Sequence, residues 1–175
     1  MEALPDRDPP VLLAGDEREV QTCNQEREGS MIIDHICIAV RNLEQGIEYW
    51  EQTFGYRQMT KPVVNSIQKV RVVFLSRHDS LPVKLIEPAE GNLSLHNFVI
   101  RGGGFHHICF RCENVNETLN QLSLKGLITL SSPQPGEAFN NHPIAFMLAR
   151  NGLNIELIDT DEKAEVIPFS PDQGD

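Results

Sequence analysis

Two short strings of the sequence place histidines where an enzyme could use them. His35 lies in Asp-His-Ile-Cys-Ile (34–38), and His107 lies in His-His-Ile-Cys-Phe (106–110), 72 residues later. The same offset sets Lys84 of one apolar run opposite Glu156 of another. Imidazole and carboxylate groups transfer protons near neutral pH and also bind divalent metals. Whether these four side chains act together depends on the elements that carry them.

The chain contains an internal repeat that extends well beyond these strings. At the same offset, Asn42 falls on Asn114, and each Asn precedes a stretch with helical spacing of apolar residues. Each copy begins with an apolar strand, 32–40 or 105–112, followed by a helix that the Asn caps. Three further strands follow in each copy. The sequence therefore predicts an α+β fold of two tandem βαβββ modules that form a curved sheet.

Alternation along a strand sorts the histidines onto one face. His35, Cys37 and Ala39 point one way, and the apolar residues between them point toward the helix. By the same rule His107 shares the face of His35, whereas His106 points to the helix side as an ordinary hydrogen-bonded polar residue. Two histidines and Glu156 therefore share an equivalent face of three strands, turned toward the concavity of the sheet.

Composition excludes several classes of partner. The 175 residues carry 15 Lys and Arg against 25 Asp and Glu, a net charge of −10, so duplex nucleic acid is not an expected partner. No apolar run approaches the roughly 20 residues of a membrane span, and the N-terminus lacks the basic and apolar regions of a secretory signal. We therefore expect a cytoplasmic protein without a membrane or nucleic-acid partner, whose cysteines are free thiols.

The acidic residues gather at the two ends of the chain. Residues 1–30 carry eight acidic residues against three Arg, and residues 161–175 carry five against one Lys. Such segments bury too little apolar surface to offset the entropy of chain ordering. We expect an acidic N-terminal arm at 1–30 and an acidic tail at 163–175, both dispensable for folding. The single domain spans 31–162: module one at 31–90, a linker at 91–104 and module two at 105–160.

Three strings together carry a family resemblance: residues 34–40, 103–110 and 154–159. They resemble the vicinal oxygen chelate (glyoxalase/bleomycin resistance) superfamily, and most closely its methylmalonyl-CoA epimerase branch. The resemblance implies paired modules that form a cup, the concave side of the sheet, whose floor holds one divalent metal ion. The implied ligand positions are His35, Lys84, His107 and Glu156. The resemblance also implies a small-molecule substrate and homodimer formation.

Lys84 departs from the family pattern, which places Gln or Glu at this position. An ammonium group cannot coordinate a metal, so His35, His107 and Glu156 remain as ligands for Zn, Co, Mn, Ni or Fe(II). Two histidines and one carboxylate are also the iron ligands of non-haem oxygenases. The other interpretation of the pattern is a buried ion pair between Lys84 and Glu156 in a metal-free binding cup.

A divalent ion bound to a carbonyl oxygen makes the neighbouring proton removable. The resemblance thus implies a glyoxalase- or epimerase-like isomerase or lyase that acts on a small carbonyl or CoA-type acyl-thioester acid through a metal-stabilised enolate, with Glu156 and Lys84 as catalytic residues. The alternatives are a non-haem Fe(II) ring-cleaving dioxygenase and a non-enzymatic metabolite- or antibiotic-binding protein. In each case the expected cup lining consists of Val70, Val72, Phe74, His142, Ile144 and Phe146.

Overall fold

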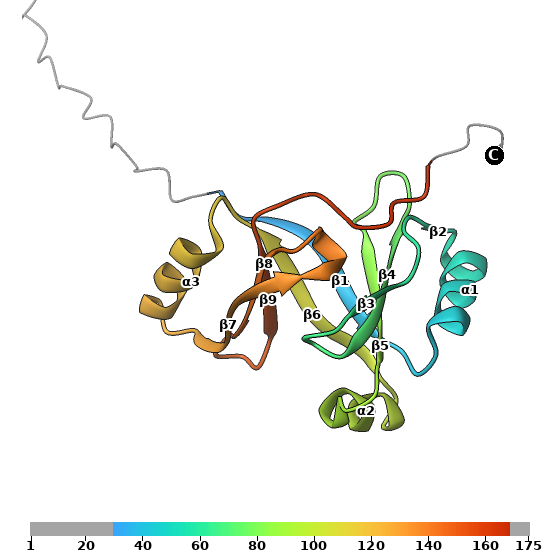
Figure 1. Cartoon of the computed structure of the whole chain (residues 1–175), viewed down its shortest axis with the longest axis horizontal. Helices are drawn as coiled ribbons and strands as arrows, with labels where there is room; N and C mark the ends of the chain where they lie inside the picture. The colour runs from blue at the N-terminus through green and yellow to red at the C-terminus, as the bar shows by residue number, and fades with distance from the viewer. Residues whose placement is uncertain (1–29, 169–175) are drawn as a thin grey trace, which may run out of the picture.

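One curved sheet organises the part of the chain, residues 30–168, that the computed structural model describes (Figure 1). Its strand order is β2-β4-β5-β1-β6-β9-β8-β7, and β3 pairs with β4. The predicted N-terminal arm, 1–30, lies outside the described residues except for its last residue. The predicted α+β architecture is confirmed.

The second half of the sheet follows the predicted order of elements, and the first half has one short strand more, because β2 and β3 both pair with β4. The first half comprises β1 (Ile32–Ala39), α1 (Leu43–Phe54), β2 (Arg57–Gln58), β3 (Val63–Asn65), β4 (Val70–Ser76) and β5 (Val83–Pro88). After α2 (Leu93–Ile100), the second half comprises β6 (Gly104–Arg111), α3 (Val115–Leu124), β7 (Ile128–Gly136), the short 3₁₀ helix η1 (Glu137–Phe139), β8 (His142–Leu148) and β9 (Asn154–Ile158). The helices begin where the sequence predicts, because the side chains of Asn42 and Asn114 accept hydrogen bonds from the first turns of α1 and α3.

The first strands of the two halves join the sheet at its centre. β1 pairs in parallel with β5 of its own half and antiparallel with β6 of the other half. β6 likewise pairs in parallel with β9. The four strands predicted to carry the functional residues are therefore adjacent, and a single chain forms the whole cup.

The two faces of the sheet bury different residues, as alternation predicts. Cys37, Ala39 and Cys109 belong to the core on the concave side. On the convex side, Leu43 of α1 packs over β4 and β5, and Val115 of α3 packs over β8 and β9. The helices thus occupy the outer face and leave the concave face for a site.

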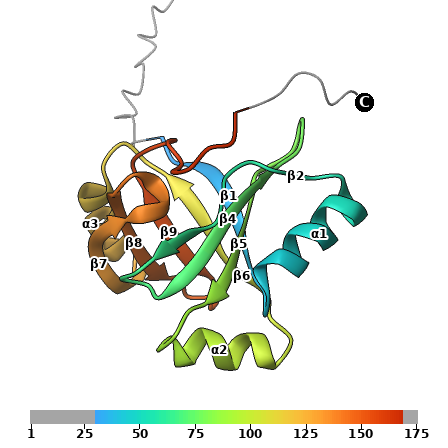
Figure 2. The same ribbon diagram turned by 45° about the vertical axis from the view of Figure 1, so that its right-hand side comes forward.

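The predicted linker, 91–104, is more ordered than the sequence indicates. It contains α2, which lies where β5 ends and β6 begins (Figure 2). Gly103, at a φ of 65°, passes close to β1: a Cβ atom there would lie 2.5 Å from the carbonyl oxygen of Ala39. Only glycine permits this approach. Gly103 therefore belongs to a tight turn against β1 and not to a loose connection.

The predicted acidic tail, 163–175, also differs from expectation in its first part. Figure 1 shows the segment after β9, in red, crossing from the half with α3 to the half with α1. Backbone hydrogen bonds hold it there, from Ala164 to Ala138, from Lys61 to Glu165 and from Ile167 to Met59. We call residues 160–167 the crossing segment. The rest of the predicted tail, from 169, lies outside the described residues.

Two further sequence-based expectations concern thiols and membranes. Cys37, Cys109 and Cys112 are free and buried, whereas Cys23 lies outside the described residues. In the described part of the chain, no helix combines the length and the apolar character needed to cross a membrane.

Candidate active site

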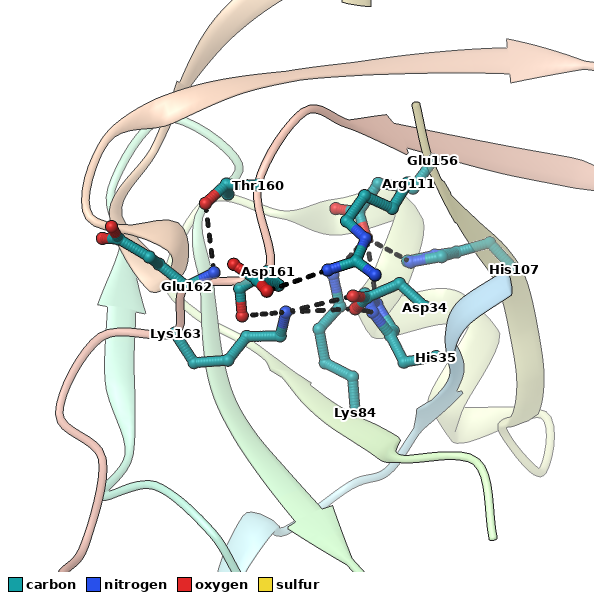
Figure 3. A network of polar contacts seen from close by, with 10 residues as sticks. All are labelled: Asp34, His35, Lys84, His107, Arg111, Glu156, Thr160, Asp161, Glu162 and Lys163. Atoms are coloured by element: carbon teal, nitrogen blue, oxygen red, sulfur yellow. Dashed lines mark hydrogen bonds and ion pairs between the residues drawn. The ribbon is translucent and has the colours of Figure 1, made fainter. Parts of the chain in front are cut away.

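At the floor of the cup, three nitrogen atoms converge on one carboxylate oxygen. Lys84 Nζ donates to Glu156 Oε2 at 2.5 Å, and the Nε2 atoms of His35 and His107 each lie 3.1 Å from the same oxygen (Figure 3). Lys84 comes from β5, His35 from β1, His107 from β6 and Glu156 from β9, so both halves contribute. All four side chains are buried. The structure thus brings together the four residues that the repeat singled out.

His35 and His107 each contact, through Nδ1, the side chain of the residue that precedes them. The pairing of β1 with β6 is irregular at two places, and its register skips Asp34 of β1 and His106 of β6. A bulge of this kind lets two successive side chains reach the same face. Asp34 Oδ1 lies 2.7 Å from His35 Nδ1, and His106 Nδ1 lies 2.8 Å from His107 Nδ1. The prediction that His106 points to the helix side is therefore wrong, because it lies beside His107 on the cup side.

The contact with Asp34 fixes the orientation of the His35 ring. Asp34 lies at Nδ1, so Nε2 on the far side of the ring is directed toward Glu156. The ring thus bridges two carboxylates, at 2.7 Å from Asp34 and 3.1 Å from Glu156. Two carboxylates in a buried place require positive charge nearby.

The electrostatics of the cluster keep its ion pair charged. Burial alone would raise the pKa of Glu156, but Lys84 and His107 lower that pKa well below its usual range. Burial alone would lower the pKa of Lys84, but the charge of Glu156 raises it above the ordinary value. Burial lowers the pKa of His107 to about 3. At neutral pH, Lys84 and Glu156 are therefore both charged and His107 is neutral.

A second lysine balances the remaining carboxylate. Lys163 of the crossing segment places Nζ 3.1 Å from Asp34 Oδ1 and 5.0 Å from the ring centroid of Phe139. Burial alone would raise the pKa of Asp34, but the hydrogen bond from His35 and the charge of Lys163 lower it. The floor of the cup thus holds two carboxylates and two ammonium groups (Figure 3).

A cavity of about 540 Å³ extends from the cluster along the concave face. Its walls include Val70, Val72 and Phe146, three of the residues expected to line the cup. Apolar walls with a few polar groups at one end are typical of small-molecule sites. The ionisable side chains among its described lining residues are those of Lys84, His106, His107 and Glu156.

The other three residues expected to line the cup are not among the residues that line this cavity. Phe74 and Ile144 are fully buried in the core around Phe139. His142 is half-exposed at the start of β8, with Nδ1 3.6 Å from Asp159 Oδ1. At this end of the concave face, Phe139 of η1 packs against Phe74, with ring centroids 5.5 Å apart.

Sequence reasoning missed three contributors: Asp34, Lys163 and Phe139. Asp34 carries a signal in the repeat, because the offset of 72 residues sets it on His106, directly before the second histidine. Lys163 and Phe139 have no equivalent signal. Their positions depend on contacts between distant segments, which no local pattern contains.

Comparison with known proteins agrees with this geometry. Residues 34–146 match the family described as Glyoxalase/Bleomycin resistance protein/Dioxygenase superfamily. The chain belongs to this superfamily. It is 34% identical over 128 residues to the uncharacterized protein YqjC of Bacillus subtilis, which covers 71% of this chain and 89% of that protein.

Two further relatives of this superfamily member have names that state an activity. Identity is 26% over 129 residues to the ethylmalonyl-CoA/methylmalonyl-CoA epimerase of Cereibacter sphaeroides, with 71% of this chain and 95% of that protein covered. A solved structure of a variant Streptomyces coelicolor methylmalonyl-CoA epimerase, in complex with 2-nitronate-propionyl-CoA, matches with a TM-score of 0.64 and 27% identity. That match covers 73% of this chain and 96% of the solved one.

The donor set of this superfamily member matches a divalent metal only in part. The donor atoms of His35, His107 and Glu156 lie within 4.8 Å of one another, and their chemical types suit such an ion. The Lys84 ammonium, however, already binds the carboxylate oxygen that the ion would need. It has no lone pair to donate, and its charge repels a dication. With Lys84 in place, the residues do not fit the divalent ion expected from the resemblance.

Two other groupings near the cluster are poorer candidates for a metal. Asp34 and His35 lie near Cys109, and Cys37 lies near the two adjacent histidines of β6. Burial raises the pKa of Cys37 and of Cys109 above the ordinary value for a thiol. Because metals bind the thiolate form, these protonated thiols do not complete a site.

Proposed function

We propose that this chain transfers the proton on the carbon next to the thioester carbonyl of a CoA-type acyl substrate, as an isomerase of the epimerase type. The observation that carries the proposal is the buried cluster of Lys84, His35, His107 and Glu156, with its lysine ammonium, at the end of an apolar cavity. The names of the epimerase relatives support this class of substrate.

The shape of the cavity suits an extended ligand. A second cavity of about 340 Å³ shares Ser94, Leu95, His106 and Asn154 with the first. Together the two cavities provide a path from the cluster past α2 toward the surface. We place the acyl group of the substrate at the cluster and the rest of the thioester along this path.

The reaction needs a positive charge near the carbonyl oxygen. When the neighbouring proton leaves, negative charge develops on that oxygen, and fixed positive groups lower the energy of this enolate. A nitronate is likewise an anion whose charge lies on oxygen, so the ligand named in the Streptomyces coelicolor structure supports the same class of reaction.

The proton acceptor that we assign is His106. Glu156, the base expected from the sequence, is bonded by Lys84 and has a pKa well below its usual range, so it accepts a proton poorly. His106 lines both cavities and does not contact Glu156 in the described structure. Burial lowers its pKa, which keeps its ring neutral at pH 7.

A binding protein without catalysis is the second candidate, and the closed Lys84–Glu156 pair favours it, because such a pair can serve as a structural part of a metal-free cup. The dioxygenase alternative needs Fe(II) on His35, His107 and Glu156. The charge of Lys84 opposes that ion as it opposes any other divalent cation.

Deuterium exchange separates these candidates. The full-length protein is incubated with methylmalonyl-CoA or ethylmalonyl-CoA in D₂O, and mass spectrometry follows deuterium at the carbon next to the thioester carbonyl. We expect catalysed exchange, and a His106→Gln variant should lose roughly a hundredfold in rate, as is typical for loss of a general base. Binding without exchange would favour the binding protein. If the protein neither binds the substrate nor catalyses exchange, this substrate class is rejected.

A matched control separates chemistry from damage to the fold. His78 is almost fully exposed, and its ring contacts only Asp79 among the described residues. His78→Gln should leave exchange unchanged. Thermal melting of both variants shows whether His106→Gln retains the fold, and an exchange rate equal to that of wild type in a folded His106→Gln protein would contradict the assignment of the base.

A further inference from the structure

Lys84 occupies the position that the duplication pairs with Glu156. The two residues stand at the same register in β5 and β9, the last strands of the two halves, and their side chains meet at 2.5 Å. Both are almost completely buried, at 3% and 1% exposure. A lysine in this position is therefore held inside the cup and does not reach solvent.

The Lys84 ammonium shares its carboxylate partner with both floor histidines. An ammonium group donates three hydrogen bonds. Glu156 Oε2 accepts one, and the Nε2 atoms of His35 and His107 lie 3.1 Å from that same oxygen. These three atoms form the donor set that would otherwise surround a metal ion.

The positive and negative charges at the floor of the cup balance without an added ion. Asp34 and Glu156 supply two negative charges, and Lys84 and Lys163 supply two positive ones. A divalent ion at the cluster would add two positive charges in a buried place, next to an ammonium that cannot move into solvent. Uncompensated charge of this kind is strongly unfavourable in a protein interior.

We propose that the Lys84 ammonium is the permanent cation of this site and takes the place of the divalent metal ion that the family resemblance implies. This inference rests on the proposed function, because the role of the cation is to stabilise an enolate oxygen. Lys84 donates an N–H to that oxygen while the proton of the neighbouring carbon moves to His106. No bond to Lys84 forms or breaks, and the ammonium keeps its proton throughout. His106 returns the proton to the planar enolate carbon after the other face of that carbon has turned toward its ring, which inverts the configuration.

A cation that belongs to the chain has a direct consequence for metal dependence. Catalysis continues after chelation, because no ion has to be acquired from solution. The histidines then act as positioning residues: their Nε2 atoms contact Glu156 Oε2, the oxygen that binds the ammonium, and their Nδ1 atoms contact Asp34 and His106.

Cobalt titration tests the inference without relying on catalysis. The full-length protein, freed of metal by dialysis against EDTA, is titrated with Co²⁺ near pH 7, and bound cobalt is measured by visible absorption and elemental analysis. We expect no stoichiometric binding at the cluster in wild type. Lys84→Gln should gain one bound cobalt per chain, because it replaces the ammonium by an oxygen donor.

A control and an independent outcome keep the test decisive. Lys61 is exposed, with Nζ 3.9 Å from Glu165, so Lys61→Gln removes the same charge far from the cup and should bind no cobalt. Tight stoichiometric cobalt binding by wild type would overturn the inference even if Lys84→Gln failed to fold. A folded Lys84→Gln protein that binds no cobalt would overturn it as well.

Deuterium exchange in the same samples distinguishes this inference from the proposed function. Exchange by wild type in the presence of EDTA supports both. Exchange that appears only after metal is added rejects the permanent cation and keeps the function. Absence of exchange from a protein that also binds no metal rejects the function and, with it, the catalytic role of Lys84. Lys84→Gln without added metal should lose roughly a hundredfold or more in exchange rate, as is typical when a donor to an oxyanion is removed.

Discussion

At the scale of single residues, two bulged positions decide the chemistry of the cup. Asp34 and His106 each precede a floor histidine, and each contacts the Nδ1 atom of that histidine. The sequence predicts that His35, His107, Lys84 and Glu156 share a surface, because the repeat and strand alternation are sufficient for that. The bulges escape prediction because alternation assumes an unbroken ladder, and an extra residue reverses the face of its side chain.

The first prediction concerns His107 and pH. Its pKa is lowered to about 3 in the folded protein, so below its ordinary value of about 6.5 the unfolded chain binds a proton that the folded chain refuses. This contribution to stability is lost as pH falls from about 6.5 toward 3. Urea unfolding at pH 7 and pH 5 should show a decrease in the free energy of unfolding of wild type, at up to about 1.4 kcal/mol per pH unit from this group. The decrease should be smaller in His107→Gln, where only the lowered pKa of His106 still contributes in this way.

The exposed His78 again provides the control, since His78→Gln should keep the wild-type dependence on pH. The lowered pKa values of Glu156 and Asp34 act at more acidic pH, where their stabilising contributions disappear as pH falls below their ordinary values. If the free energy of unfolding decreased equally in wild type and His107→Gln between pH 7 and pH 5, the account of His107 as a buried neutral ring would be contradicted.

At the scale of elements, the structure corrects the sequence at the two segments that were expected to be irregular. α2 has a local signal, because Asn92 caps it and Leu95 and Val99, four residues apart, are buried against the core. The crossing segment has none. Its residues are mostly polar, and its order comes from backbone hydrogen bonds to β2–β3 and η1 and from the burial of Lys163.

The second prediction concerns a truncation that removes most of the crossing segment. A chain that ends at residue 162 loses three backbone hydrogen bonds and the contact of Lys163 with Asp34, each worth about 1 kcal/mol or more. Differential scanning calorimetry should show a melting temperature lower by about 10 °C. A chain that ends at residue 168 is the matched control and should melt like the full-length protein.

The opposite result has a clear meaning here. Melting of the chain ending at 162 at the temperature of the full-length protein would restore the expectation from composition that everything from 163 onward is dispensable. Lys163 would then contribute nothing measurable to the floor of the cup.

At the scale of the whole molecule, duplication explains how one chain builds a cup with two equivalent sides. The pairing of β1 with β6 brings the first strands together, and β5 and β9 flank them. The described chain completes the cluster without a second copy. The homodimer implied by the resemblance stays a proposal, which analytical ultracentrifugation would test, and formation of the active site does not depend on it.

The symmetry of the fold also shows where the two halves diverged. Glu156 and Lys84 occupy equivalent positions, yet one is the anion and the other the cation of a single pair. The relative position of these residues follows from the repeat. The ion pair was one of two interpretations compatible with the sequence, and only the geometry of the four strands distinguishes between them.

The central claim is that this cup transfers a proton next to a thioester carbonyl with its own lysine as the cation. The most direct measurement is the rate of deuterium incorporation into methylmalonyl-CoA in D₂O, catalysed by the full-length protein in excess EDTA. The account predicts exchange well above the uncatalysed rate, with no increase when Co²⁺ replaces the chelator. Exchange that is absent in EDTA and appears only with added Co²⁺ would contradict it.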